Sequence, residues 1–208
     1  MGCGFDIKDL GPLHYFLGLQ VKPHSNGLHI NQLKYAHDIL EKHYLLLNQP
    51  VSTPMSAKAV LTTHDGDLLE NPIVFREIVG SLQYLTITRP DIAFAVNYVS
   101  QFMSQPRAPH LIAAKRILRY VKGTLGHGLY FSPQRQPAHL SAYSDADSAG
   151  CPESRRSTSS YLIYLGNTLI AWCSKKQPTI ARSSAKSEYR SLAHSSAETT
   201  WLGFLLAI

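Results

Sequence analysis

Three acidic residues near the C-terminal end of the sequence have the types and spacing of metal ligands. Asp145 and Asp147 end an alternating apolar and polar segment that begins at Leu140, and Glu188 lies near the start of a long helical pattern. Mg²⁺ prefers oxygen ligands and keeps several waters, so two or three carboxylates and a substrate phosphate can hold it. A divalent-metal site can therefore form where a helix brings a second carboxylate back to the carboxylate at a strand end.

Simpler interpretations of these acids stay open. An Asp-x-Asp pair at a strand end is often a turn former, and the helix dipole favours a Glu in a first turn. The helical pattern supports the metal hypothesis, because at about 100° per residue the apolar members of one side must face the core. We therefore expect Glu188 at the inward-facing N-terminal end of this helix. The residues on that side are Glu188, Leu192, Ser195, Thr199, Leu202 and Leu206.

The neighbouring segments predict the elements that position these acids. A basic turn with Arg155 and Arg156 leads into apolar runs at 160–165 and 168–174, which are typical of strands. Strands followed by a long helix indicate an α/β (α+β) fold class. The sequence has no H-E-x-x-H, G-x-S-x-G or phosphate-binding P-loop motif, so other catalytic classes have little support.

The first part of the chain predicts a β-hairpin followed by helices. Asn26-Gly27 has the residue types of a tight hairpin turn, and Asn31 is a plausible N-cap for a helix over 32–43. Further helices are predicted over 73–87, 90–103 and 110–122, and a short strand over 128–131. Pro/Ser/Thr-rich residues 48–54 and residues 132–138 read as linkers. The domains expected are 1–56, 57–131 and 138–208.

Basic side chains are concentrated on the predicted helix over 110–122. The net charge of the chain is only +6, but no acidic residue occurs between Asp91 and Asp145. Lys115, Arg119 and Lys122 form a stripe beside the apolar face of the helix, which suits a phosphate backbone. A solvated surface helix explains the same pattern, so charge alone does not decide between nucleic-acid binding and an ordinary surface.

The cysteines and the hydropathy favour a cytoplasmic or nuclear protein that is not secreted. Cys3, Cys151 and Cys173 form no C-x-x-C pair, and three unpaired thiols fit a reducing compartment. No apolar run approaches the ~18–20 residues of a membrane span. We therefore expect no membrane partner.

A series of segments resembles copia-type LTR retrotransposon polyproteins, in order along nearly the whole chain. The resemblance implies the end of a reverse transcriptase palm over 1–56, a helical thumb or connection region over 57–131, and an RNase H-like domain over 138–208. In that domain a mixed sheet is followed by a long helix. The segments are residues 9–18, 78–85, 88–92, 115–124, 143–147, 155–158, 174–178 and 187–190.

The resemblance also implies an activity, which is two-metal hydrolysis of RNA in RNA–DNA hybrids. Carried over, Asp145 and Glu188 would be the catalytic metal ligands for Mg²⁺ or Mn²⁺, with Asp147 as a less certain ligand. Arg155 and Arg156 would contact the hybrid backbone. The implied partners are an RNA–DNA hybrid or template–primer duplex and the remainder of the polyprotein.

The sequence departs from the family pattern at two functional motifs. The Tyr-x-Asp-Asp motif of the polymerase is expected before Asp9 and is absent, and the third acid of the nuclease is expected after the helix in which the chain ends. We therefore expect an incomplete RNase H-like sheet, exposed apolar surface from Trp201 onward, and weak or absent hydrolysis. The alternatives are a non-catalytic template–primer binding module and a relic without a biochemical role.

Overall fold

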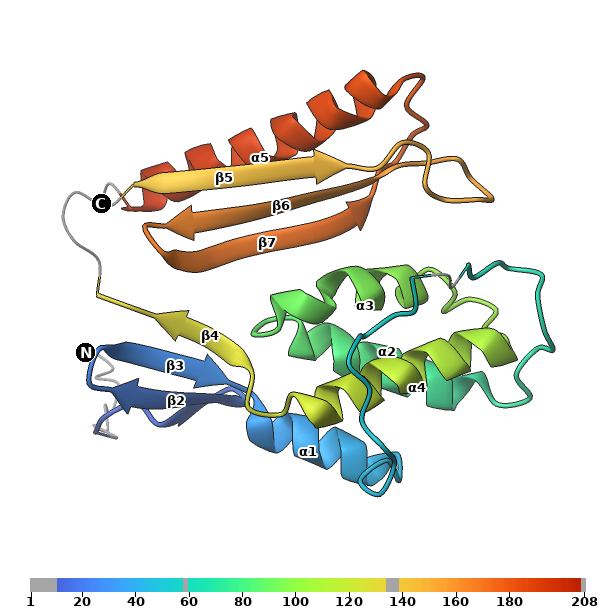
Figure 1. The fold of residues 1–208 in the computed structure, drawn as a ribbon, viewed down its shortest axis with the longest axis horizontal. Helices are drawn as coiled ribbons and strands as arrows, with labels where there is room; N and C mark the ends of the chain where they lie inside the picture. Colours follow the sequence, from blue (N-terminus) through green and yellow to red (C-terminus); the bar gives the residue numbers. More distant parts are fainter. Residues whose placement is uncertain (1–10, 58–59, 134–138, 207–208) are drawn as a thin grey trace, which may run out of the picture.

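The computed structural model describes residues 11–57, 60–133 and 139–206, which form two halves (Figure 1). In the N-terminal half (residues 11–133) helices pack beside a four-stranded sheet. In the C-terminal half (residues 139–206) one long helix covers a three-stranded sheet. The fold is thus mixed α and β with antiparallel sheets, which confirms the predicted class in its general form.

The N-terminal sheet joins the predicted hairpin to a strand from far along the chain. Its strands are β1 (Tyr15–Phe16), β2 (Leu19–His24), β3 (Gly27–Asn31) and β4 (Gly128–Phe131), in that order and all antiparallel. The turn lies one residue earlier than predicted, since His24 pairs with Gly27 across Ser25 and Asn26. Gly27 has φ +141°, a conformation that side chains rarely adopt, so glycine is required at this position.

The predicted helices are confirmed with small changes at their ends. They are α1 (Leu33–Lys42), α2 (Pro72–Leu85), the short 3₁₀ helix η1 (Pro90–Ile92), α3 (Ala93–Ser100) and α4 (Ala108–Gly123). The Asn71 side chain accepts a 3.0 Å bond from the Ile73 amide, which caps α2. At α1 the cap position is Gln32, one residue later than predicted, while Asn31 Oδ1 accepts from the Leu33 amide at 3.2 Å.

One hydrophobic core runs through the whole N-terminal half. It contains residues of all four α-helices, so the domain boundary predicted between 56 and 57 does not separate two cores. Its most buried members include Leu40, Phe75, Ile78, Leu82, Ile92, Val99, Ile117 and Leu118.

A buried arginine links η1 to the end of α4. Arg89 is only 3% exposed, and its guanidinium donates to both Asp91 oxygens at 2.9 and 2.7 Å and to the Thr124 carbonyl at 3.0 Å. Burial acts to raise the pKa of Asp91, but the hydrogen bonds and charge of Arg89 bring it below its ordinary value. The pair thus fixes the end of α4 against the start of η1.

The C-terminal half is a β-meander covered by one helix. Strands β5 (Leu140–Ala146), β6 (Thr158–Leu165) and β7 (Thr168–Lys176) lie in the order β5-β6-β7, so β5 is an edge strand. Helix α5 (Ser184–Leu206) packs on β5 and β6 and buries Ala146 and Ile163. The other face turns toward the N-terminal half, where Trp172 Nε1 donates to the Thr86 carbonyl at 3.2 Å.

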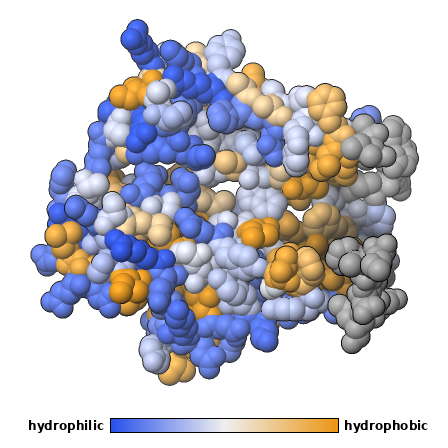
Figure 2. Space-filling view, turned by 180° about the vertical axis from the view of Figure 1, so that it is seen from behind, coloured by the Kyte–Doolittle hydropathy of each residue, from blue (hydrophilic) through white to orange (hydrophobic). Residues whose placement is uncertain are grey.

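The end of α5 exposes apolar side chains, as expected from the sequence. Trp201, Phe204, Leu205 and Leu206 are each more than half exposed. Figure 2 shows hydrophobic surface gathered on the right-hand side, where this end of the molecule lies. Among the described residues, no helix is both long and apolar enough to cross a membrane.

Candidate metal and nucleic-acid site

Asp145 lies on the edge strand, on the sheet face opposite α5. In the ladder Asp145 pairs with Ser160 and Tyr143 pairs with Leu162, and alternate residues of a strand share a face. Ala146 points the other way and is buried under α5, whereas Asp145 is exposed. Asp145 also borders a cavity of about 300 Å³ between the two halves. Its carboxylate is therefore accessible to solvent and to a ligand.

Glu188 does not face the core, so that expectation was wrong. Glu188 is exposed and Leu192 is 50% exposed, while the buried face of α5 consists mainly of serines. Ser191 shows the physical reason, because its Oγ donates to the carbonyls of Asp145 at 2.7 Å and Ser160 at 3.1 Å. Small side chains bring the helix close to the sheet, and their hydroxyls are satisfied there. The buried residues of α5 are Ser187, Ser191, Ser195 and Leu202.

Glu188 nevertheless lies on the side of α5 that is nearest the edge strand. Arg190, on the opposite side, donates to Gln177 Oε1 at 3.3 Å and to the Thr179 carbonyl at 2.9 Å, both beyond the end of β7. At about 100° per residue, Glu188 then projects toward β5. Helix α5 starts at the end of the sheet where β5 finishes (Figure 1). Glu188 precedes Ser191, whose hydroxyl contacts the Asp145 carbonyl, by three positions, which is about one helical turn.

Asp147 stabilises the turn after β5. Its Oδ1 accepts hydrogen bonds from the amides of Gly150 and Thr158, each at 3.0 Å. A Cβ at Gly150 would lie within 3 Å of the same carboxylate, so a larger residue there would displace the Asp147 side chain. These contacts favour the simpler interpretation of Asp147 as a residue that orders the turn.

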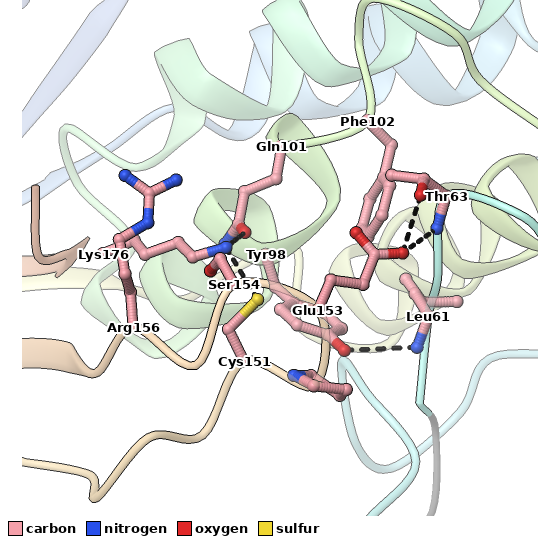
Figure 3. Close-up of a pocket in the computed structure, with 11 residues that line it drawn as sticks. Leu61, Thr63, Tyr98, Gln101, Phe102, Cys151, Glu153, Ser154, Arg156 and Lys176 are labelled. Carbon is pink, nitrogen blue, oxygen red and sulfur yellow. Dashed lines mark hydrogen bonds between the residues drawn. The ribbon is translucent and has the colours of Figure 1, made fainter. Parts of the chain in front are cut away.

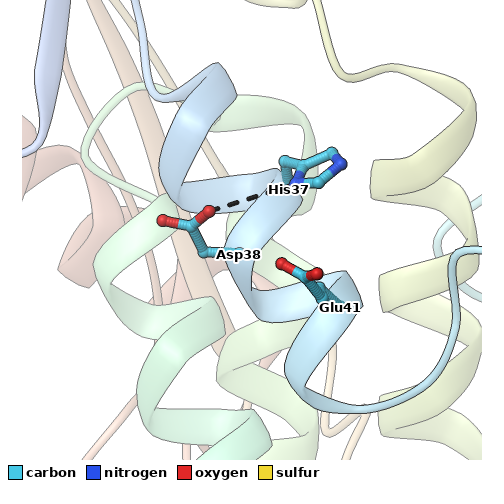
Figure 4. A group of neighbouring side chains, drawn as sticks. All are labelled: His37, Asp38 and Glu41. Atoms are coloured by element: carbon cyan, nitrogen blue, oxygen red, sulfur yellow. Dashed lines mark ion pairs between the residues drawn. The ribbon is translucent and has the colours of Figure 1, made fainter.

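The three predicted acids are not assembled into a ligand cluster. Among the described residues, the only group of three potential ligands with ligand atoms within 4.8 Å of one another is His37, Asp38 and Glu41 on α1 (Figure 4). All three are exposed, and exposed groups of this kind are common on helix surfaces. Asp145 and Glu188 fit a hydrated Mg²⁺ in donor type, since both are exposed carboxylates and Mg²⁺ retains waters.

Cations of the predicted basic stripe of α4 donate hydrogen bonds to the 48–53 loop of the same chain. Arg119 Nε donates to the Gln49 carbonyl at 2.8 Å, and Lys122 Nζ donates to the Asn48 carbonyl. Arg116, at the margin of the stripe, donates to Thr53 Oγ1 at 2.8 Å. Lys115 is exposed. No periodic pattern in the sequence indicated that these cations would meet the Asn48 and Gln49 carbonyls and the Thr53 hydroxyl.

Arg155 and Arg156 lie in the loop between β5 and β6 and differ in role. Arg155 is exposed and has φ +52°, and its amide donates to the Cys151 carbonyl at 2.9 Å. Arg156 is partly buried and donates from Nη1 to the Pro178 carbonyl at 3.2 Å. The loop therefore presents the Arg155 cation to solvent, while Arg156 joins it to the segment that leads into α5.

Comparison with known proteins identifies the relatives of this chain. It is 48% identical to the uncharacterized mitochondrial protein AtMg00810 of Arabidopsis thaliana over 95% of this chain and 81% of that protein. It is 47% identical to the retrovirus-related Pol polyprotein from transposon RE1 of the same plant, over 97% of this chain. A third relative is the Pol polyprotein from transposon TNT 1-94 of Nicotiana tabacum, 38% identical over 95% of this chain. The chain belongs to the family of copia-type retrotransposon Pol polyproteins and AtMg00810-type proteins.

The match to the copia-type Pol polyproteins covers a small part of their length. The chain spans 14% of the RE1 polyprotein and 15% of the TNT 1-94 polyprotein, which supports its interpretation as a retrotransposon-derived fragment of a Pol polyprotein. No family model matches the chain, and no solved structure matches it.

Proposed function

We propose that this copia-type chain is part of a reverse transcriptase and ribonuclease H region, and that its site acts on the RNA of RNA–DNA hybrids. The observation that carries the proposal is the bond from Ser191 Oγ to the Asp145 carbonyl. It holds α5 against β5 at Asp145, and Glu188 precedes Ser191 by about one turn of the same helix. Bound Mg²⁺ or Mn²⁺ would supply an activated water and stabilise the leaving oxygen.

The chain's own residues bind and orient in this proposal. Asp145 and Glu188 hold the metal, Asp147 orders the turn that follows Asp145, and Arg155 meets the phosphate backbone of the hybrid. Hydrolysis by this chain alone is expected to be weak or absent. The reason is that the two carboxylates are exposed and are not held together in a cluster, and a loosely held metal is a poor catalyst.

The test combines cleavage of a labelled RNA–DNA hybrid in Mg²⁺ with binding of Mn²⁺ followed by electron paramagnetic resonance. We expect cleavage at or near background, and weak Mn²⁺ binding that is reduced in both Asp145→Asn and Glu188→Gln. Glu70→Gln, which removes an exposed acid outside the candidate site and outside the α1 group, is the control and should leave binding unchanged. Mn²⁺ binding that neither site variant weakens would contradict the proposal.

A template–primer binding module is the second candidate, and the exposed Lys115 beside Arg119 and Lys122 favours it. Duplex affinity should fall as salt rises, because phosphate contacts release counterions. Lys115→Gln should reduce the slope of log affinity against log salt by about 1. Lys34→Gln on α1 is the control, since Lys34 is also an exposed helical lysine. An affinity that does not change with salt would exclude this candidate.

A further inference from the structure

A cavity of about 390 Å³ lies between the two halves and is lined by residues of both (Figure 3). The C-terminal half contributes the loop after β5, including Cys151, and Lys176 at the end of β7. The N-terminal half contributes Gln101, Tyr98 and the segment around Thr63. The volume is within the range of ordinary small-molecule sites, about 300–1,000 Å³.

A cysteine and a lysine meet at this cavity. Lys176 Nζ lies 2.7 Å from Cys151 Sγ and also donates to Gln101 Oε1 at 3.0 Å. Burial acts to raise the pKa of the Cys151 thiol, but hydrogen bonds from Lys176, from the Ser154 side chain and from the backbone of Ser154 and Glu153 together outweigh it and bring the pKa to about 7. Cys151 is thus substantially a thiolate at neutral pH, and the thiolate is the nucleophilic form of cysteine.

The other cysteine of the described residues is in a different environment. Cys173 lies on β7, and burial raises the pKa of its thiol. The neighbouring Lys175 acts in the opposite direction but does not overcome the burial. The fold therefore separates the two thiols, with the thiolate at the cavity and the protonated thiol within the sheet.

Most other polar groups that line the cavity are already engaged. The Glu153 carboxylate accepts from the amide and the hydroxyl of Thr63, and the Leu61 amide donates to Tyr98 Oη at 3.1 Å. The Ser154 side chain also acts on the Cys151 sulfur, where its hydrogen bond helps to lower the pKa of the thiol.

We propose that Cys151 is a modification site that undergoes thiol–disulfide exchange with a low-molecular-weight disulfide bound in this cavity. The Cys151 thiolate attacks one sulfur of the disulfide, a new Sγ–S bond forms, and the original S–S bond breaks. The departing thiolate takes the electron pair and gains a proton from solvent. The reaction removes the negative charge that Lys176 contacts. This proposal is independent of the hybrid-cleavage proposal.

The test measures the reaction of the full chain with 5,5′-dithiobis(2-nitrobenzoate) in a Cys3→Ser background. Peptide mass spectrometry assigns each label, and circular dichroism verifies that each variant is folded. We expect Cys151 to react at least about tenfold faster than Cys173 at pH 7, with a rate that rises through a midpoint near 7. Oxidised glutathione, used as a second probe, should label the same residue.

Paired lysine variants decide whether Lys176 is responsible. Lys176→Met should slow the labelling of Cys151 by about fivefold at pH 7 and move the midpoint of the pH–rate curve upward. The factor is modest because a smaller fraction of Cys151 is thiolate, while each remaining thiolate is more nucleophilic. Lys175→Met, the neighbouring lysine, is the control and should leave the labelling of Cys151 unchanged. Equal effects of both variants, equal reaction of Cys173, or a midpoint at the ordinary thiol value would overturn the proposal.

Discussion

The two halves of the molecule are stabilised by different kinds of contact. The N-terminal half buries large hydrocarbon side chains such as Phe75, Leu82 and Ile117, all fully shielded from solvent. In the described part of the C-terminal half, the buried hydrophobic side chains are Ala146, Ile163 and Leu202. Much of the contact of α5 with its sheet is instead made by buried serines. The first half has a hydrophobic core of ordinary size, and the second has a small one.

This difference predicts unequal local stability. Burial of apolar area is the main favourable term in folding, so the half with the smaller core should open at a lower free energy. Packing at the junction between the halves is incomplete, because cavities of about 390 and 300 Å³ lie along it. Openings between the halves are also visible in the space-filling view of Figure 2.

The largest effect is expected from shortening a core side chain of the N-terminal half. Ile117→Ala should cost about 2–5 kcal/mol in the free energy of unfolding, measured by urea denaturation, because it leaves a cavity in a closely packed core. Ile112→Ala on the same helix is the matched control, since Ile112 is 69% exposed, and should change stability by no more than about 0.5 kcal/mol. Similar costs for the two variants would contradict the proposed location of the core.

A smaller effect is expected at the serine contact of the C-terminal half. Ser191→Ala removes the hydrogen bonds to the Asp145 and Ser160 carbonyls and should cost about 1 kcal/mol. The loss should appear in hydrogen exchange as faster opening of β5 and α5, with α2 and α4 unaffected. Ser196→Ala, an exposed position of the same helix, is the control. Faster exchange in α2 or α4 instead would show that the halves open together.

The smallest effect is a loss of stability at low pH, which we expect from His110. The His110 side chain is buried. Its Nδ1 accepts a hydrogen bond from the Arg107 amide, and its Nε2 contacts the Thr62 carbonyl. Burial is the main cause that lowers the pKa of His110. The unfolded chain therefore binds the proton more readily. The contribution of His110 to stability is complete above 6.5, the ordinary pKa of histidine, and it is lost as pH falls below that value. His110→Gln should flatten urea midpoints between pH 7 and 5, and an unchanged slope would contradict this role.

Local chemistry made the elements of the N-terminal half predictable from sequence. Asn71 and Pro72 begin α2 and Gly123 ends α4, because caps, proline and glycine act through the adjacent backbone. The strands over 160–165 and 168–174 were likewise predicted, and the structure extends them to β6 and β7. The pairing of β4 with β3 could not be predicted, because it joins residues about a hundred positions apart.

The candidate site was less predictable because its residues depend on contacts between elements. Of the side of α5 that periodicity predicted to face the core, the structure buries Ser195 and Leu202 but exposes Glu188 and Leu192. Ser187 and Ser191, which the pattern did not indicate, are buried instead. Small polar residues leave no signal in a hydrophobic pattern, yet they bring a helix close to a sheet when their hydroxyls find acceptors. Similarly, the sequence determined that α4 carries a basic stripe, but only the path of the 48–53 loop decided which partners it has.

The sequence by itself determined the family, the order of strands and helices, and the acids that could bind a metal. Tertiary structure decided which groups are accessible and which are paired. It placed Asp145 on an edge strand, left Glu188 exposed on α5, used Asp147 in a turn, and brought Lys176 to the sulfur of Cys151. The physical reason is distance along the chain: caps and periodicities act over a few residues, whereas charge pairs, burial and cavities arise only when distant segments meet.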